Sequence, residues 1–233
     1  MQPNRSLLDI KKEKESSIFE AACRVIREKG YHQARITDIA QSAGISYGLV
    51  YHYFKSKADL FDAILKEWWS GLFSMMERGE DAALSVEEKL AGIIGYFLEQ
   101  YEKKPDLVHI FITEISRSSA NLTPERLHMF RIFMERTQKI IAGGQETKVL
   151  RSDIKARYLT YIFLGALESF VSILVLEGRP LRGRAERQRI ATALLETFLN
   201  GARVSRGSAS LECPEERKQA VSRLGKRTEE YSP

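Results

Sequence analysis

Residues 37–60 read TDIAQSAGISYGLVYHYFKSKADL, and this stretch decides the local fold. Its first half places apolar residues on one helical face, at Ile39, Ala40 and Ala43. Gly44 follows where the chain must reverse, since glycine adopts a positive φ without a Cβ clash. A second short apolar run then returns to the core. The pattern predicts a helix-turn-helix, whose second helix enters the major groove of DNA.

Both helices of this motif have a hydroxyl residue at the expected start. Thr37 and Ser46 are the predicted N-caps, because a side-chain oxygen accepts hydrogen bonds from the free N–H groups of a first helical turn. Phe54, just after the second helix, is expected to lie in the core and to hold the next helix against the motif, since buried aromatic side chains dominate cores.

This stretch resembles the DNA-binding domain of TetR-family transcriptional regulators. The residues that carry the resemblance are Thr37, Ile39, Ala40, Ala43, Gly44, Ile45, Ser46, Gly48, Leu49, Tyr51, Tyr53, Phe54, Lys57 and Leu60. A preceding helix, with Ala21, Ala22, Ile26, Gly30 and Tyr31, is similar to the first helix of that family. The resemblance covers about the first quarter of the chain. The alternative interpretation is a helical hairpin in another kind of all-α domain.

The candidates for DNA contact lie in and around the second helix: Thr37, Ser46, Tyr47, Gly48, Tyr51, His52 and Lys57. Tyr47 and Tyr51 are one helical turn apart, so both can reach phosphates, base edges or thymine methyls. Gly48 between them allows a close approach of the helix to the DNA backbone. The resemblance implies that Lys57, at the start of the next helix, lies against a phosphate. Thr37 is a further candidate for a phosphate contact.

The whole chain is expected to be all-α, because proline is sparse and strand-type alternation is nowhere sustained. An N-terminal three-helix DNA-binding domain at 1–56 precedes an antiparallel helical bundle for ligand binding and dimerisation at 57–206. Residues 207–233 are polar and charged, which predicts a disordered tail. Outside the motif, helices are predicted over 11–29, 57–77, 85–101, 106–115, 123–142, 154–176 and 184–203.

Several of these helix ends have a sequence signature. Ser85 with Glu88 forms a capping box, and Thr123 followed by Pro124 is a cap with proline at the first helical position. Asp106 is the predicted cap of the helix after the Lys103-Lys104-Pro105 break. Gly143-Gly144 is expected to end the helix that begins at residue 123.

Composition narrows the classes of function. The chain has 233 residues, 43% of them hydrophobic, which suits a packed core, and a net charge of +5 is compatible with a polyanionic partner. Cys23 and Cys213 are far apart, so neither a disulfide framework nor a zinc site is expected. The polar N-terminus lacks an apolar signal segment, which favours a cytoplasmic location. No catalytic arrangement stands out, so an enzyme, a metal or a cofactor is not expected.

The segment from Tyr158 to Leu176 is apolar almost all round and is near the length of a membrane span. Glu168 in its middle argues against a membrane, and a helix that is apolar on every side is expected to be buried on every side. With the next helix it forms the best homodimer surface. Small residues would let the helices approach closely: Gly165, Ala166, Ala193 and Gly201. Larger residues would supply apolar area: Leu167, Phe170, Leu174, Leu194 and Phe198.

Residues 85–176 carry more aromatic side chains than a minimal core requires, which predicts an apolar effector pocket. The alternative is that these aromatics only fill the core. Glu114 and Glu168 lie within apolar runs, and buried carboxylates need partners; Arg117 or Arg131 would pair with Glu114 or face an anionic ligand group. The predicted effector-binding residues are Tyr96, Phe97, Phe111, Glu114, Phe130, Phe133, Phe163 and Glu168.

A second, looser resemblance concerns residues 104–107, 113–118 and 165–168, which look like those of TetR regulators that control fatty-acid degradation and sense long-chain acyl-CoA. It implies a dimeric repressor that binds double-stranded operator DNA and is released by an apolar effector of the acyl-CoA class. Two alternatives remain open at the level of sequence. One is a transcriptional regulator without a small-molecule effector, and the other is a helical adaptor with a non-functional DNA motif.

Overall fold

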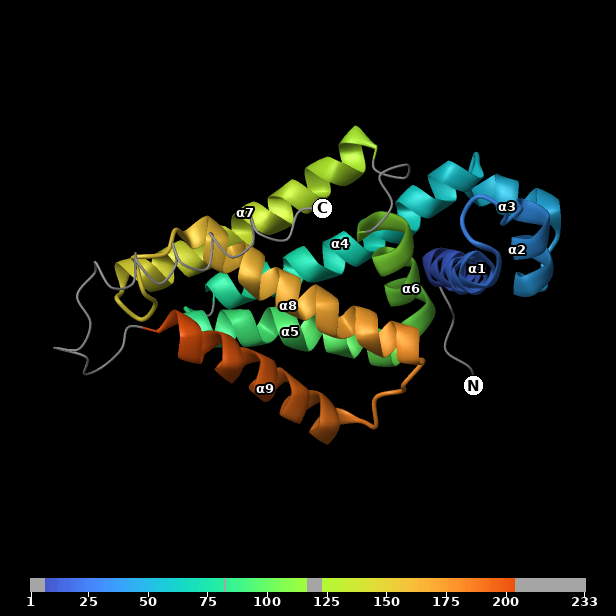
Figure 1. Cartoon of the computed structure of the whole chain (residues 1–233). Coiled ribbons are helices and arrows are strands. Elements are labelled where there is room, and N and C mark those ends of the chain that lie inside the picture. The colour runs from blue at the N-terminus through green and yellow to red at the C-terminus, as the bar shows by residue number, and fades with distance from the viewer. Residues whose placement is uncertain (1–6, 82, 117–122, 204–233) are drawn as a thin grey trace, which may run out of the picture.

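The computed structural model describes residues 7–81, 83–116 and 123–203, and this part of the chain is almost entirely helical (Figure 1). The elements in chain order are α1 (Leu7–Lys29), α2 (Ile36–Ala43), α3 (Tyr47–Tyr53), α4 (Lys57–Asp81), α5 (Val86–Lys103), α6 (Pro105–Ile110), the π-helix η1 (Phe111–Ser116), α7 (Pro124–Glu146), α8 (Ala156–Glu177) and α9 (Arg184–Ala202). The predicted all-α class is confirmed.

The first three helices form a small domain around one core, and the long helix α4 runs from it along the rest of the molecule (Figure 1). Ile39 and Val50 from the two motif helices are fully buried there, together with Ile18 of α1. Phe54 is buried as predicted and packs against Phe19, with ring centroids 5.6 Å apart. The helix-turn-helix is therefore a folded unit of its own.

Most of the predicted helix ends are confirmed in detail. Gly44 has a φ of +65°, the left-handed conformation that favours glycine, and Ser46 Oγ accepts a hydrogen bond from the Leu49 N–H at 3.3 Å. The capping box has both of its hydrogen bonds, from the Glu88 N–H to Ser85 Oγ (3.1 Å) and from the Ser85 N–H to the Glu88 carboxylate (2.8 Å). Thr123 caps α7, since its Oγ1 accepts a hydrogen bond from the Arg126 N–H at 3.3 Å.

Three predicted ends are wrong. Thr37 does not cap α2, which begins one residue earlier; the Asp38 carboxylate instead accepts the Arg35 N–H at 3.2 Å. Asp106 lies inside the first turn of α6, because Pro105 already starts that helix. Helix α7 continues past Gly143-Gly144 to Glu146. Gly144 is buried there for packing, since an added Cβ would lie 2.9 Å from Leu150 Cδ1.

The predicted helix over 106–115 is divided into α6 and the π-helix η1. Ile110, Phe111 and Ile112 are consecutive and all buried. In an ordinary α-helix three consecutive residues spread over about 200°, so a surface helix rarely buries all of them. The π segment is frequent at functional sites, and periodicity alone gave no sign of it.

The C-terminal bundle is built around α5, which packs against α4, α7, α8 and α9. Trp68 and Trp69 of α4 are almost fully buried and meet the ring of Phe111 from two directions, at centroid distances of 4.9 and 5.4 Å. The hydroxyl of Tyr101 donates to the Leu174 carbonyl at 2.7 Å and so ties α5 to the end of α8. The core of the bundle is therefore continuous from α4 to α8.

Helix α8 is not buried on every side within one chain, contrary to the prediction. One face, including Phe163 and Leu167, is in the core, while large apolar side chains on the other face are between 47% and 75% exposed: Tyr158, Tyr161, Ile162, Ile173 and Leu176. By length and hydropathy alone α8 would suit a membrane span, with 39% of its apolar window buried in this chain. An apolar face this wide needs a cover that a single chain does not supply.

Candidate DNA interface and effector cavity

The recognition helix α3 presents two tyrosines as a pair. Tyr47 and Tyr51 are 50% and 41% exposed, and their ring centroids are 4.8 Å apart. A hydrogen bond with Tyr51 raises the pKa of Tyr47, so the hydroxyls are linked as well as the rings. An added Cβ at Gly48 would meet no atom within 4 Å, which leaves the helix surface between the tyrosines open. The arrangement suits contact with a groove wall.

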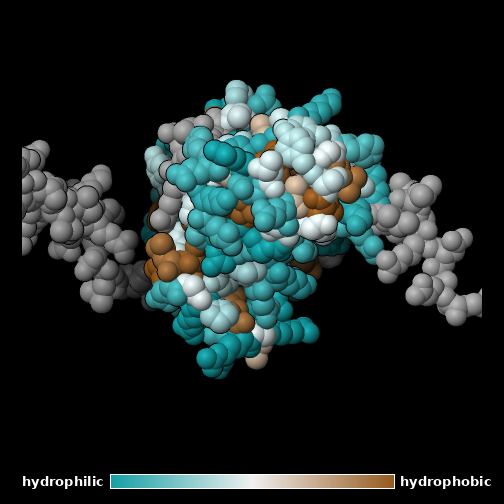
Figure 2. All heavy atoms as spheres, turned by 90° about the vertical axis from the view of Figure 1, so that its right-hand side faces the viewer, coloured by the Kyte–Doolittle hydropathy of each residue, from teal (hydrophilic) through white to brown (hydrophobic). Residues whose placement is uncertain are grey.

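The other candidates for DNA contact surround this pair. Thr37 is exposed in the first turn of α2, and Ser46 is exposed at the N-cap of α3. His52 is exposed in α3, next to Tyr51. The end of the molecule that carries α1–α3 is mostly hydrophilic, with small paler and apolar patches (Figure 2). This surface brings the predicted residues other than Lys57 to one exposed part of the domain.

Lys57 contacts backbone groups of its own chain. Its ammonium donates to the carbonyls of Tyr31, His32 and Ala34 at 2.7, 3.1 and 3.0 Å and lies 4.6 Å from the centre of the Tyr31 ring. An ammonium has three N–H donors, and all of them are used here. In this structure the ammonium of Lys57 is therefore engaged within the protein, and its predicted contact with a phosphate stays a prediction. Lys57 fastens the turn between α1 and α2 to the start of α4.

A cavity of about 260 Å³ lies between α5, η1, α7 and α8. Most of the predicted effector-binding residues line it: Phe97, Phe111, Phe130, Phe133 and Glu168. Glu168 places a carboxylate in an otherwise apolar wall, where it accepts a hydrogen bond from Ser172 at 3.3 Å. Few polar groups in an apolar, aromatic lining are the usual features of a small-molecule site.

The remaining predicted effector residues lie elsewhere. Tyr96 packs against Trp68 and donates to the Trp68 carbonyl at 3.0 Å, and burial raises its pKa to about 12. Phe163 is buried against Phe198 of α9, with centroids 5.2 Å apart. Glu114 accepts the Tyr31 N–H from the DNA-binding domain at 3.4 Å. None of these three residues lines the cavity, because helical spacing does not show which side of the bundle a residue faces, and their role in effector binding stays a prediction.

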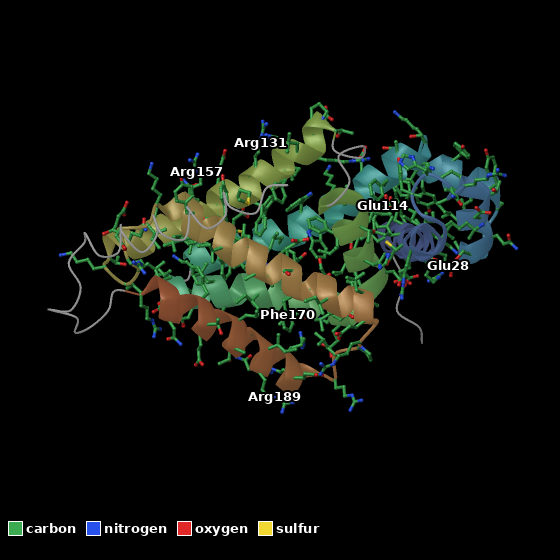
Figure 3. The ribbon with its side chains drawn as sticks, viewed as in Figure 1. Glu28, Glu114, Arg131, Arg157, Phe170 and Arg189 are labelled. Carbon is green, nitrogen blue, oxygen red and sulfur yellow. The ribbon has the colours of Figure 1, made fainter. Side chains whose placement is uncertain are left out.

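The cavity also has walls outside the set of predicted effector-binding residues: Ile112, Met134, Tyr161, Leu164, Gly165 and Leu167. Their apolar character fits core and cavity equally, so no sequence signal separates the two. Arg131 projects outward from the exposed side of α7, and Arg157 is exposed in the first turn of α8 (Figure 3). Arg157 is one helical turn before Tyr161 and thus on the same face.

A further arginine of α7, Arg136, is engaged within the chain. Arg136 pairs with Glu77 at 2.9 Å and lies over the Phe73 ring, 4.9 Å from its centre. Arg117 lies outside the described residues. Among the residues that the structure describes, no group of three or more His, Cys, Asp or Glu side chains could hold a metal ion. Cys23 is buried in the first domain, and burial raises its pKa to about 12.

A second hollow, an apolar groove of about 680 Å³, runs between α8 and α9. The small residues predicted for a dimer surface are all exposed, and Ala166, Ala193 and Gly201 line this groove. Phe170 projects between the two helices (Figure 3). Leu174 and Phe198 also line this groove, although little of either side chain is exposed, whereas Leu167 is buried and lines the effector cavity.

Comparison with known proteins agrees with this architecture over both domains. A relative, the fatty acid metabolism regulator protein of Bacillus subtilis (strain 168), is 24% identical over 191 residues, or 82% of this chain and 96% of that protein. The solved structure of the fatty acid degradation regulator FadR from Bacillus halodurans has a TM-score of 0.71 at 23% identity, covering 81% of this chain and 95% of the other.

The structure of FadR from Bacillus subtilis in complex with stearoyl-CoA has a TM-score of 0.65 at 22% identity, covering 80% of this chain and 98% of the other. At such identities the likeness of structures shows the fold. The family models show more than the fold: residues 18–64 match bacterial regulatory proteins of the tetR family, and residues 65–192 match the C-terminal region of YsiA-like proteins. The chain therefore belongs to the TetR family of DNA-binding bacterial regulatory proteins.

Proposed function

We propose that this protein is a homodimeric repressor that an acyl-CoA releases from its operator. The observation that carries the proposal is the aromatic cavity between α5, η1, α7 and α8, with exposed Arg131 next in sequence to Phe130 of its lining and exposed Arg157 one helical turn before Tyr161. It lies in the region that matches YsiA-like proteins, and the Bacillus subtilis FadR structure with the same fold contains stearoyl-CoA. An acyl chain suits the rings, and the phosphates of coenzyme A suit the guanidinium groups.

In this proposal α3 reads the DNA, with Tyr47 and Tyr51 as the central contacts and Thr37, Ser46 and His52 around them. The unit that reads DNA is the region 1–56, and the region from 57 onward binds effector and partner. One such motif touches too few base pairs for high specificity, and two copies about one DNA turn apart remedy this. The open groove and exposed apolar face of α8 supply the surface that joins the two copies.

The size of the cavity indicates how much of a long effector fits before the walls must move. At roughly 30 Å³ for an atom the size of water, 260 Å³ holds about nine atoms. A long acyl chain therefore fills the existing space and pushes the walls apart. Each buried CH₂ contributes about 0.8 kcal/mol, so binding strengthens with chain length as long as the walls yield. This displacement is the event that weakens operator binding.

The test is a titration of the DNA complex. An operator is first selected from random duplexes with the wild-type protein, which tests sequence-specific binding directly. Acyl-CoAs of increasing chain length, free fatty acids and planar aromatics are then added, and bound DNA is followed by fluorescence anisotropy. Release that grows with acyl length is expected. Release by planar aromatics alone would keep the cavity and reject acyl-CoA, and no release at all would favour a regulator without a small-molecule effector.

A further inference from the structure

The turn between α1 and α2 is held from two sides, and Tyr31 is the residue where the two meet. Its carbonyl accepts from Lys57 Nζ of α4 at 2.7 Å, and its ring lies 4.6 Å from the ring of Phe61 on the same helix. Its N–H donates to Glu114 Oε1 of η1 at 3.4 Å. One residue of the DNA-binding domain is thus linked both to the start of α4 and to the effector domain.

The segment that carries Glu114 is also a wall of the cavity. Phe111 and Ile112 of η1 line the cavity, and Glu114 follows two residues later in the same π-helical stretch. Helix α6, which leads into η1, packs against α1, where Arg27 forms an ion pair with Asp106. Glu114 lies where the effector domain faces α1 (Figure 3). A movement of η1 at the cavity therefore moves a contact to the DNA-binding domain.

A π-helical turn provides two discrete arrangements for such a movement. Its i→i+5 hydrogen bonds compete with the i→i+4 bonds of an α-helix, and π-helices are rare and mostly limited to single turns, frequently at functional sites. A change from π to α register advances the following residues by one position, about 100° around the axis. Such a change takes Glu114 away from the Tyr31 N–H, while Lys57 still holds the Tyr31 carbonyl.

We propose that η1 is the two-state element that couples the cavity to DNA binding, and that Glu114 is the positioning residue that passes its state to Tyr31. The inference rests on the proposed function only for the identity of the effector. With the cavity as it stands, the Glu114–Tyr31 contact stabilises the turn that Lys57 fastens to α4. Filling the cavity displaces Phe111 and Ile112 and breaks this contact. The turn and the start of α4, still joined through Lys57, are then released from η1, and α4 follows α3 by a few residues.

A side chain that fills the cavity from within tests this coupling without any ligand. Leu164 lines the cavity from α8, and Leu164→Trp acts as the internal wedge. The full-length protein is compared as wild type, Glu114→Ala, Glu114→Gln and Glu28→Ala, each with and without L164W. Glu28 is an exposed carboxylate near the same end of α1 and serves as the matched control (Figure 3). Thermal melting confirms that each variant is folded.

Operator affinity is the first readout. In the wild type we expect L164W to weaken operator binding at least fivefold, the lower end of usual allosteric coupling. Glu114→Ala should by itself weaken operator binding about twofold to tenfold, the value of one hydrogen bond, and should shrink the effect of L164W by a similar factor. Glu114→Gln keeps an acceptor oxygen and should behave as wild type, as should Glu28→Ala. An unchanged L164W effect in Glu114→Ala overturns the proposal.

Palmitoyl-CoA provides the second readout, with its binding measured directly by calorimetry and its effect on DNA by anisotropy. We expect Glu114→Ala to bind palmitoyl-CoA within about twofold of wild type while releasing less DNA. If palmitoyl-CoA does not bind but L164W acts through Glu114, the proposed effector is wrong and this inference stands. If neither L164W nor palmitoyl-CoA weakens operator binding of the wild type, the cavity is not coupled to DNA and the inference fails.

Discussion

At the scale of single residues, tyrosine serves separate purposes in this chain because it combines an apolar ring with a hydroxyl. Tyr101 is buried and uses its hydroxyl to join α5 to α8. Tyr31 offers its backbone and its ring to hold a turn. Tyr47 and Tyr51 keep both parts exposed on α3. An exposed aromatic pair with no role in the core of its own chain is the feature expected of a contact surface.

Tyr51→Ala tests that surface. The substitution should weaken operator binding by about 1–3 kcal/mol if the ring or hydroxyl contacts a base edge or a thymine methyl. Because the side chain is 41% exposed, the thermal midpoint should hardly change. Tyr51→Phe, which keeps the ring, separates a stacking role from a hydroxyl role in the same binding assay. Wild-type affinity in both variants would remove Tyr51 from the interface.

For Lys57 we expect a substitution to lower the stability of the fold rather than to remove a DNA contact. Lys57→Met keeps the aliphatic stem but loses hydrogen bonds to the carbonyls of Tyr31, His32 and Ala34, so it should cost about 1.5–3 kcal/mol of unfolding free energy. Urea denaturation measures this loss. The salt dependence of operator affinity should keep the wild-type slope, because the ammonium is engaged within the protein. A flattened slope in a protein of normal stability would restore Lys57 as a phosphate contact.

At the scale of elements, two helices differ from what their local sequence favours, and both differences coincide with close packing between helices. Helix α7 tolerates Gly143-Gly144 without ending, because Gly144 is buried against Leu150 and Val86. The π turn of η1 buries Phe111 and Ile112 together. In both cases a contact from a distant part of the chain overrides the local preference of the sequence, as tertiary packing commonly does.

Gly144→Ala tests the first of these cases. Alanine normally stabilises a helix relative to glycine by up to about 1 kcal/mol. Here the added Cβ would lie 2.9 Å from Leu150 Cδ1 and 3.1 Å from Val86 Cγ1, so overpacking should instead cost about 1–3 kcal/mol. Gly143→Ala is the matched control, since its Cβ would meet nothing within 4 Å. Two stabilised variants in thermal melts would mean that Gly144 is not in tight contact.

At the scale of the whole molecule, α8 and α9 present an apolar surface that no other described residue covers. In the proposed dimer, the groove between them, with small residues along its lining, accepts the corresponding face of a second copy. Such isologous contact would place the two helix-turn-helix units at a fixed separation, which the DNA-binding domain by itself cannot do.

Ala193→Arg places a charge in this groove and should convert the dimer to a monomer, because an unpaired charge at an apolar interface is strongly unfavourable. Sedimentation velocity measures the change, and operator affinity should fall with it. Glu196→Arg, an exposed change on the same helix away from the groove lining, is the control and should remain dimeric. A dimeric Ala193→Arg protein would place the interface elsewhere.

The sequence by itself determined the features that depend on neighbours a few residues apart. The turn at Gly44, the cap at Ser46 and the capping box of Ser85 with Glu88 use backbone conformations and hydrogen bonds local to the chain. The order of the helices followed for the same reason, since hydrophobic periodicity is local. The match of the motif to the TetR family was strong because such local rules fix many positions at once.

Only the tertiary structure decided which of several equivalent apolar residues face a cavity, a core or a partner. Phe133 lines the cavity while Phe163 is in the core beside α9, although both lie at helical spacing. Lys57 was expected at a phosphate, and in the structure its ammonium donates hydrogen bonds to carbonyls at and near Tyr31. These outcomes depend on contacts between residues far apart in the chain, and the periodicity of one helix carries no information about what the other helices bring to it.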